Sequence, residues 1–586
     1  MPCGAGLVVW QHRGMNPSQA LAEVLVDELV RHGVTDVVLC PGSRSAPLAY
    51  AVHDADRASR VRLHVRVDER SAGFLALGLA KVSRRVVPVI TTSGTAVANL
   101  HPAVLEAHHA GVPLLVLSCD RPAELLRTGA NQTTVQPGLF GEALRWRHEI
   151  PAPERRAGQT AVWRSAVSRA CAAAAGALTG WAGPVHLDVG LRDPLTPDDS
   201  HDWPESLEGR PGGDPWTAVA SRASRTAPGI PHGAGVDDVP RTVVLLGDLP
   251  EPAMADEAVR LAAAAGWPVV AEPFGLMDRT SVLPHGPLLL TCRPWLESHL
   301  PARVLVVGRL TLTRDVAALM RLVDRVECVT PVPDWPDPSA RVGRVHAWEA
   351  LSATEIRPRS AEDAEWSARW REAGRRLAAT PLWAADEPSG LAVASAVLET
   401  LAELPGAATL FVGSSQSARD LDWASAGFAT PVTVVASRGL AGIDGCVSTA
   451  TGLALAGDGP TVALMGDLTF LHDANGLLIG PHEPVPELTI VVVNDDGGAI
   501  FSTLEHGDPS RAAQFERVFG TPTGTDLAAL CAAHGVAHER VTTIPALRDA
   551  LRRKASGIRV VEVPLSRTGV RGARATVRAN VAAALA

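Results

Sequence analysis

Two apolar runs near the end of the chain restrict the fold most, because each leads into an oxygen-bearing side chain. Residues 462–465 lead towards Asp467, and residues 490–493 lead into Asn494. Such runs are typical of strands buried in a parallel sheet, whose ligand-facing edge is formed by the carboxyl ends of its strands. With a helix predicted between them over 471–479, the two runs form one βαβ unit. We therefore expect Asp467 and Asn494 at the same edge of one sheet.

A carboxylate and an amide oxygen at neighbouring strand ends are typical of a divalent-cation site. Mg²⁺ takes oxygen ligands of this kind and completes its coordination with phosphate oxygens and water. The dipeptide Gly466-Asp467 alone has a simpler interpretation, a strand-to-helix turn with aspartate as the cap. The second strand, ending in Asn494 at this distance, favours the metal site.

Strand-like and helical segments alternate along the chain, with one helix predicted over 95–110, and this alternation predicts an α/β fold with parallel sheets. We expect a first domain over 15–195, opened by a helix that Asn16 or Ser18 caps, a second over 241–360 and a third over 388–586. The remaining segments are a dispensable tail (1–14), a Pro/Gly-rich linker or loop (196–240) and a helical linker (361–387).

Polar loops follow the expected strands of the first domain. The carboxyl ends of parallel strands share one edge of a sheet, so these loops are expected to lie near one another. Their residues are 41–44 (PGSR), 68–70 (DER), 92–95 (TSGT) and 120–122 (DRP), with 129–132 (GANQ) further along.

Composition excludes several classes of protein. With 46% hydrophobic and 20% charged residues over 586 positions, the chain is typical of a globular protein of several domains. Its net charge of −9 argues against a nucleic-acid partner and means that an anionic substrate needs locally placed arginines. Eight scattered cysteines, no membrane-length apolar run and no signal-peptide pattern predict a cytoplasmic enzyme with reduced thiols and no membrane partner.

Six segments, taken in order and spacing, are similar to those of a known family. They are PGSRSAPLAYA, TSGTAVANLHPAVLEA, DRPAELLRTGANQT, SRGLAGIDG, GDLTFLHDANGL and NDDGGAIFS. Together they resemble the thiamine-diphosphate enzymes, and among these the 2-succinyl-5-enolpyruvyl-6-hydroxy-3-cyclohexene-1-carboxylate synthases of menaquinone biosynthesis. The resemblance runs from Met15 almost to the end and is weakest in the middle domain. It implies three doubly wound parallel-sheet domains: pyrimidine-binding, middle and diphosphate-binding.

The resemblance implies thiamine diphosphate and Mg²⁺ or Mn²⁺ as cofactors. It assigns the metal to Asp467, Asn494 and the main chain of Asp496. Glu69 matches the acid that hydrogen-bonds to the pyrimidine ring, and an equal alternative is a first-turn acid that stabilises a helix dipole. Ile443 matches the apolar wedge that bends the cofactor, and a core isoleucine is its alternative. The full cofactor set is Glu69, Ile443, Gly466, Asp467, Leu468, Asn494 and Asp496.

The reaction implied by the resemblance is a decarboxylating transfer. The enzyme decarboxylates 2-oxoglutarate on the cofactor and adds the resulting carbanion to isochorismate in a conjugate addition. Both substrates are dicarboxylates, so convergent arginines are a physical requirement. The implied catalytic residues are Glu69, Arg44, Gln132, Arg419 and Arg438. The implied substrate-binding residues are Ser43, Arg44, Arg121, Asn131, Gln132, Arg314, Ser415, Arg419, Arg438, Ile500 and Phe501.

The resemblance also implies a homodimer or a homotetramer, because the superfamily places its cofactor between the first domain of one subunit and the last domain of another. Two alternatives stay open. One is another thiamine-diphosphate enzyme, either a 2-oxoacid decarboxylase or an acetolactate-synthase-like enzyme, although the PGSR loop and the many arginines do not favour it. The other is a binding or regulatory subunit without catalysis, against which Glu69, Asp467 and Asn494 argue.

Overall fold

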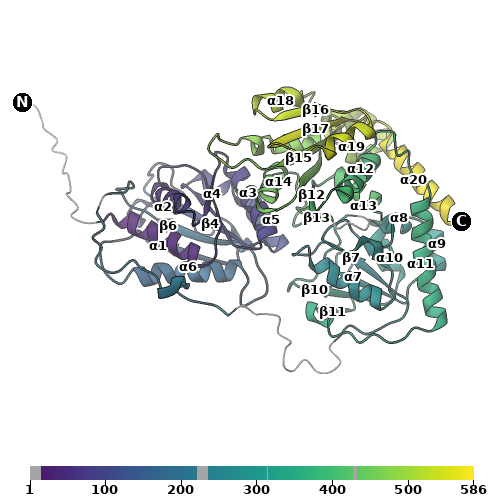
Figure 1. The fold of residues 1–586 in the computed structure, drawn as a ribbon, viewed down its shortest axis with the longest axis horizontal. Helices are drawn as coiled ribbons and strands as arrows, with labels where there is room; N and C mark the ends of the chain where they lie inside the picture. Colours follow the sequence, from purple (N-terminus) through teal and green to yellow (C-terminus); the bar gives the residue numbers. More distant parts are fainter. Residues whose placement is uncertain (1–14, 199, 221–234, 313, 427–431) are drawn as a thin grey trace, which may run out of the picture. The chain divides into compact units, whose positions relative to one another are not determined.

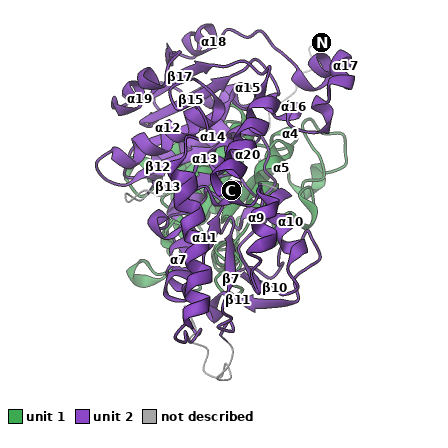
Figure 2. Cartoon of the chain, turned by 90° about the vertical axis from the view of Figure 1, so that its right-hand side faces the viewer, with its two compact units in different colours: residues 1–80, 84–108, 112–221 green, residues 81–83, 109–111, 222–586 purple. Residues whose placement is uncertain are grey.

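The structure is a computed structural model that describes residues 15–198, 200–220, 235–312, 314–426 and 432–586 (Figure 1). The predicted tail, residues 1–14, lies outside the described residues. The chain divides into two compact units (Figure 2). The N-terminal unit is residues 1–80, 84–108 and 112–221, and the C-terminal unit is residues 81–83, 109–111 and 222–586.

A six-stranded parallel sheet forms the centre of the N-terminal unit, with the strand order β2-β1-β3-β4-β6-β5. Its strands are β1 (Asp36–Leu39), β2 (Arg62–Val65), β3 (Val87–Thr91), β4 (Leu114–Asp120), β5 (Trp146–Ile150) and β6 (Val185–Gly190). Its helices are α1 (Pro17–Arg31), α2 (Ala46–Arg57), α3 (Glu69–Ser83), α4 (Thr95–Ala98), α5 (His101–Ala110) and α6 (Thr160–Ala174).

Helices cover both faces of this sheet and bury the apolar side chains of its strands. Helices α1, α2 and α6 share one core with the strands. Helices α3 and α5 pack closely together, since a Cβ added to Gly73 would lie 2.9 Å from the Cβ of Ala103. The predicted first helix is confirmed, and the Asn16 side chain caps it by accepting a hydrogen bond from the amide of Ser18 at 2.9 Å.

The chain after β6 packs against α1 and α6. Glu28 accepts the amide of Trp216 at 2.6 Å, and Arg164 donates to the carbonyl of Leu207 at 2.6 Å. Trp203 is 9% exposed and belongs to the same core. This part of the Pro/Gly-rich segment, described up to residue 220, is therefore held on the N-terminal unit.

The C-terminal unit contains two further sheets. The first has five strands in the order β11-β10-β9-β7-β8. Buried apolar runs form its central strands, as the sequence predicted for the middle domain. Its elements are β7 (Thr242–Leu246), β8 (Val269–Ala271), β9 (Arg303–Val307), β10 (Val326–Thr330) and β11 (Arg344–Ala347), with α7 (Met254–Ala264), α8 (Gly286–Leu289), α9 (Arg293–Ser298), α10 (Arg314–Leu322) and α11 (Ala361–Ala379).

The second sheet of this unit has six strands in the order β13-β12-β14-β15-β17-β16. Helices α12, α13 and α19 share a core on one face, and α14 and α18 lie on the other. The strands are β12 (Ala408–Val412), β13 (Val432–Ala436), β14 (Thr461–Gly466), β15 (Leu488–Asn494), β16 (Ala537–Arg540) and β17 (Ile558–Pro564). The helices are α12 (Gly390–Glu403), α13 (Gln416–Ala424), α14 (Cys446–Ala456), α15 (Asp467–His472), α16 (Ala499–Ser502), α17 (Ala512–Phe515), α18 (Leu527–Ala533), α19 (Ile544–Arg552) and α20 (Val570–Leu585).

All strand pairs within these three sheets are parallel, so the predicted fold class is confirmed. The seven cysteines among the described residues are buried and carry free thiols, as predicted, and Cys3 lies outside them. Within the described parts of the chain, no helix combines the length and apolar character needed to cross a membrane.

Candidate functional site

The ends of β14 and β15 bring the two predicted metal ligands to one edge of the sheet. Gly466 pairs with Val493 in the parallel register, so Asp467 and Asn494 follow at equivalent positions. The predicted helix over 471–479 is wrong in its bounds. Helix α15 begins at Asp467 and ends before Asp473, whose buried carboxylate accepts the amide of Ser448 in α14 at 2.7 Å. That bond fixes Asp473 in a non-helical conformation, and a short 3₁₀ turn follows over Ala474–Leu477.

Asp467 is a buried carboxylate with no cationic partner among the described residues. Its side chain is 3% exposed, accepts the amides of Leu468 and Gly497, and forms no ion pair with the described residues. Burial raises the pKa of Asp467 to about 6, and the negative charge of Asp496 adds to the effect. A divalent cation at this position would compensate the buried charge, so the donor set fits Mg²⁺ or Mn²⁺.

Asn494 is oriented by an acid that the sequence analysis did not identify. Its Nδ2 donates to Oε1 of Glu562 at 2.9 Å, and its Oδ1 accepts the amide of Asp496 at 3.1 Å. Glu562 is buried and is itself held by His538 Nε2 at 2.9 Å. The acidic partner fixes which end of the amide carries oxygen, and oxygen is the end that can bind a metal.

The third predicted ligand, Asp496, has a different environment. Its backbone has a positive φ of 51°, and its carboxylate accepts the amides of Thr523 and Gly524 at 3.0 and 2.9 Å. Its main-chain carbonyl accepts a hydrogen bond from Arg567 at 2.6 Å. A carbonyl oxygen has two lone pairs, so this oxygen can accept the hydrogen bond and still bind a metal. Metal binding by this group stays a prediction.

A glycine pair allows the chain to pass close to a neighbouring segment beside this edge. A Cβ added to Gly497 would lie 2.1 Å from the carbonyl oxygen of Gly520, and one added to Gly498 would lie 2.5 Å from that of Phe519. Phe519 also packs against Phe501, with ring centroids 5.6 Å apart. The predicted apolar residues Ile500 and Phe501 lie half-buried on α16, next to this contact.

Two predicted arginines follow neighbouring strands: Arg419 lies on α13, after β12, and Arg438 follows β13. Arg419 donates to the carbonyl of Ser415 at 2.8 Å, and Ser415 has a positive φ of 75°. Arg438 is 3% exposed and donates to the hydroxyl and the carbonyl of Thr311, both at 3.0 Å. Burial, together with the nearby charges of Arg438 and Arg574, lowers the pKa of Arg419. Ile443 lies half-buried in the loop between β13 and α14.

A pocket of about 660 Å³ brings arginines from three helices together. We call it the arginine pocket. Arg314 of α10 and Arg419 of α13 were predicted to bind substrate, and Arg314 forms an ion pair with Glu505 at 2.7 Å. Arg571, Arg574 and Arg578 of α20 were not predicted to bind substrate. Arg574 and Arg578 lie three and seven residues after Arg571, so all three lie on one face of the helix. Its arginines are Arg314, Arg419, Arg571, Arg574 and Arg578.

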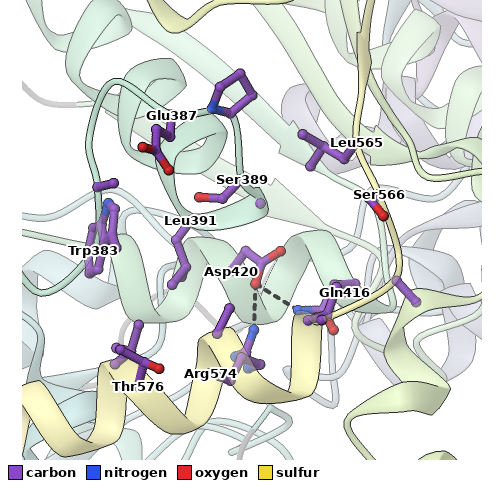
Figure 3. Close-up of a pocket in the computed structure, with 18 of the residues that line it drawn as sticks. Trp383, Glu387, Ser389, Leu391, Gln416, Asp420, Leu565, Ser566, Arg574 and Thr576 are labelled. Carbon is purple, nitrogen blue, oxygen red and sulfur yellow. Dashed lines mark hydrogen bonds and ion pairs between the residues drawn. The ribbon is translucent and has the colours of Figure 1, made fainter.

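A second cavity, of about 770 Å³, lies beside helix α20 (Figure 3). Asp420 of α13 accepts hydrogen bonds from Gln416 at 2.7 Å and from Arg574 of α20 at 2.5 Å. This buried carboxylate therefore links α13 to α20. The Arg574 guanidinium also lies 3.7 Å from the ring centroid of Trp423.

In the N-terminal unit, Glu69 is the first residue of α3 and is half-buried. Its Oε2 accepts a hydrogen bond from Asn99 Nδ2 at 3.5 Å. The helix is capped by the preceding Asp68, whose Oδ1 accepts the amides of Arg70 and Ser71 at 2.9 and 3.3 Å. Glu69 is therefore not required as the cap, and its carboxylate is placed at the carboxyl end of β2.

Three polar loops meet in this unit. Arg121 donates to the hydroxyl of Ser93 at 2.6 Å and to the carbonyl of Gln132 at 2.8 Å. The side chain of Gln132, a residue with a positive φ of 58°, donates to the carbonyl of Ser93 at 3.0 Å. Asn131 next to it is exposed. Arg121 and Gln132, both predicted to bind substrate, are thus connected by their hydrogen bonds to Ser93. The sequence analysis included Ser93 only as part of a polar loop.

The PGSR loop packs on the same region. A Cβ added to Gly42 would lie 2.3 Å from the Cβ of Thr92, so only glycine allows this approach. Arg44 donates to the carbonyl of Leu191 at 3.0 Å and lies 3.6 Å from Asp193. Ser43 is exposed.

Asp188 holds one of these loops through Gln136, and the sequence analysis did not identify it as a site residue. It is 7% exposed and accepts hydrogen bonds from Ser118 and Gln136, both at 2.7 Å. Gln136 in turn accepts the amide of Gly94 at 2.9 Å. Burial raises the pKa of Asp188 to about 7, with a smaller contribution from Asp120. Its only sequence signal is an acid inside the apolar run 185–190.

We expect Asp188→Asn to stabilise the protein at high pH. The pKa of Asp188 is higher in the folded than in the unfolded chain, so folding becomes less favourable as pH rises from about 4 through about 7. Asparagine retains an oxygen for Ser118 and Gln136 but carries no charge. The apparent Tm of the variant should match that of the wild type at about pH 4 and exceed it increasingly up to pH 8. A difference independent of pH would contradict this assignment.

Comparisons with known proteins agree with this arrangement. Residues 19–139 match the family described as thiamine pyrophosphate enzyme, N-terminal TPP binding domain, and residues 414–563 match the corresponding C-terminal TPP binding domain. The first range includes Glu69 and the second includes Asp467 and Asn494.

Curated relatives match nearly the whole chain. The 2-succinyl-5-enolpyruvyl-6-hydroxy-3-cyclohexene-1-carboxylate synthase of Saccharopolyspora erythraea is 47% identical over 576 residues, which are 97% of this chain and 100% of the relative. Enzymes of the same name from Rhodococcus erythropolis and Kineococcus radiotolerans are each 48% identical, over 97% and 98% of this chain and 100% of each relative. The chain therefore belongs to the thiamine pyrophosphate enzymes and, among them, to the family of 2-succinyl-5-enolpyruvyl-6-hydroxy-3-cyclohexene-1-carboxylate synthases.

Proposed function

We propose that this chain catalyses the reaction for which its relatives are named, as a decarboxylating transferase of menaquinone biosynthesis. Its substrates are 2-oxoglutarate and isochorismate, and its cofactors are thiamine diphosphate and Mg²⁺ or Mn²⁺. The observation that carries the proposal is the similarity to the named synthases over 97% of the chain. The buried carboxylate at the end of β14 and the arginine pocket support it.

Asp467 and Asn494 are the residues that would hold the metal and, through it, the diphosphate. Their oxygens follow paired strands, and Glu562 keeps the amide of Asn494 in the required orientation. The main-chain carbonyl of Asp496 is the third ligand in this proposal. Gly466, Leu468 and Ile443 would contact the remainder of the cofactor. When bound, thiamine diphosphate supplies the electron sink for loss of CO₂ and for carbon–carbon bond formation.

Glu69 would hold a proton at the pyrimidine end of the cofactor. Its position in a different compact unit from Asp467 supports a cofactor shared between subunits, as in a homodimer or homotetramer. We also propose a cytoplasmic location, which the free buried thiols support.

The arginines would bind and orient the substrate carboxylates. Arg419 lies on α13 after β12, Arg438 follows β13, and Arg314 reaches the arginine pocket from α10. Positive charge concentrated at these positions can attract a dianion to a protein whose net charge is −9. The remaining residues of the proposed substrate site are Ser43, Arg44, Arg121, Asn131, Gln132, Ser415, Ile500 and Phe501.

The test is CO₂ release from 2-oxoglutarate with and without isochorismate, in the presence of thiamine diphosphate and Mg²⁺. We expect release to accelerate strongly when isochorismate is added, with one equivalent of carboligation product per CO₂. A rate of CO₂ release that does not change when isochorismate is added would indicate a simple 2-oxoacid decarboxylase. No release under either condition would indicate a binding or regulatory subunit.

A further inference from the structure

The arginine pocket carries more positive charge than its own acids neutralise. Five arginines line it; Asp315 and Glu505 of its wall, together with the Asp420 partner of Arg574, offset three of them, which leaves an excess of two positive charges. The protein as a whole is negative, at −9. A concentration of like charge of this kind is unfavourable without a ligand, so the pocket is suited to an anion that carries more than one charge.

Three of the five guanidinium groups already have acidic partners. Arg314 pairs with Glu505 at 2.7 Å, and Arg578 of α20 pairs with Asp315 at 3.3 Å. Arg574 pairs with Asp420 at 2.5 Å. These pairs fix the pocket wall.

Arg419 and Arg571 differ from the other three, because neither forms an ion pair with any described residue. Arg419 donates to the carbonyl of Ser415, at 2.8 Å. The charge of Arg571 acts on Asp508, but that carboxylate accepts hydrogen bonds from the hydroxyl and amide of Ser510, at 2.6 and 2.9 Å. Two guanidinium groups in one pocket are thus available for carboxylates.

Helix α20 is held in place independently of Arg571. The Arg574 side chain joins α20 to α13 through Asp420 (Figure 3) and stacks on Trp423 at 3.7 Å. Further along the helix, Val577 and Val581 are buried in the core below the five-stranded sheet. Arg571 itself is exposed and lies one turn before Arg574, so its substitution should leave this anchoring intact.

We propose that Arg571 binds one carboxylate of a dicarboxylate substrate whose other carboxylate is bound by Arg419. This inference rests on the proposed function and adds helix α20 to the substrate site. An arginine suits the task because its planar guanidinium offers paired donors to the two oxygens of a carboxylate. Arg571 is a binding residue here and takes no part in breaking or forming bonds.

The experiment compares Arg571→Gln with the wild type as the full-length enzyme loaded with thiamine diphosphate and Mg²⁺. We expect the KM for 2-oxoglutarate or for isochorismate to rise about ten-fold or more, with kcat changed less than about three-fold, since a charge-assisted hydrogen bond is lost in both ground state and transition state. Arg571→Lys should recover part of the affinity, because it restores the charge without the paired donors.

The matched control is Arg375→Gln on α11, an exposed arginine that pairs with Glu372 outside the pocket. Its KM values should equal those of the wild type. Equal KM values for both substrates in Arg571→Gln would overturn the inference, as would a fall in kcat alone. A wild-type enzyme that fails to use isochorismate would instead contradict the proposed function, so the two failures are distinguishable.

If 2-oxoglutarate is the affected substrate, its analogue 2-oxopentanoate separates the two carboxylates. This compound has the same carbon chain but lacks the distal carboxylate. The wild type should bind it more weakly than 2-oxoglutarate. Equal affinity of Arg571→Gln and the wild type for 2-oxopentanoate would assign Arg571 to the distal carboxylate. A further loss of affinity in the variant would assign Arg571 to the carboxylate next to the ketone.

Discussion

Replacing Glu69 by glutamine is expected to lower kcat by about 100-fold or more while leaving cofactor binding nearly unchanged, since general acid–base groups contribute about 10²–10⁴-fold. Glutamine has the shape of glutamate but cannot exchange a proton with a ring nitrogen. Glu69 begins α3 at the end of β2 and is half-buried, with Asn99 as a distant hydrogen-bond partner at 3.5 Å. Steady-state turnover, together with thiamine diphosphate titration of the variant, measures the two effects separately.

The alternative role of Glu69 predicts a different outcome. A first-turn acid that only stabilises the helix dipole contributes about 0.3–1 kcal/mol to stability and nothing to turnover. Glu362→Gln is a suitable control, because Glu362 lies in the first turn of α11 in the C-terminal unit. If Glu69→Gln behaves like Glu362→Gln, with a slightly lower Tm and an unchanged kcat, Glu69 is not the activating acid.

The sequence was sufficient to predict the three sheets, because buried parallel strands appear as apolar runs. It did not predict β5, whose central residues 147–149 are exposed at the sheet edge and therefore lack such a run. It predicted one helix over 95–110, where the structure has α4 and α5 separated at Asn99 and Leu100. The bounds of α15 were also missed, because the tertiary bond between Asp473 and Ser448 ends that helix.

The candidate site was predictable where residues follow strands, since the carboxyl ends of parallel strands gather at one edge. Asp467 and Asn494 come together for this reason, as do Arg121 and Gln132 through Ser93. Residues that act from elsewhere were not predictable. Glu562 and Asp188 are single acids inside buried strands, and their roles depend on which neighbours the sheet supplies. The α20 arginines reach the pocket only through packing of that helix against α13.

Replacing Asp467 by asparagine is expected to have opposite effects on metal binding and on the stability of the metal-free protein. Loss of even a residue that supports a metal ligand costs about 10–100-fold in metal affinity, so loss of the charged ligand itself should weaken Mg²⁺ binding by about 100-fold or more. The added stability that wild-type protein gains from Mg²⁺ and thiamine diphosphate should be lost in the variant. Isothermal titration and thermal unfolding with and without both cofactors measure these effects.

The sign of the stability change in the metal-free protein follows from the raised pKa. Because the folded chain holds the Asp467 proton up to about pH 6, ionisation destabilises the fold as pH rises from about 4 to 6, and the cost persists above pH 6. Asparagine removes that cost, so the apparent Tm of metal-free Asp467→Asn should exceed that of the wild type at pH 8 and approach it at about pH 4. Asp526→Asn is the control, because Asp526 caps α18 by accepting the amide of Ala529 at 3.0 Å, and asparagine caps equally well. Unchanged metal affinity in Asp467→Asn would mean that this carboxylate serves only as the first residue of its helix.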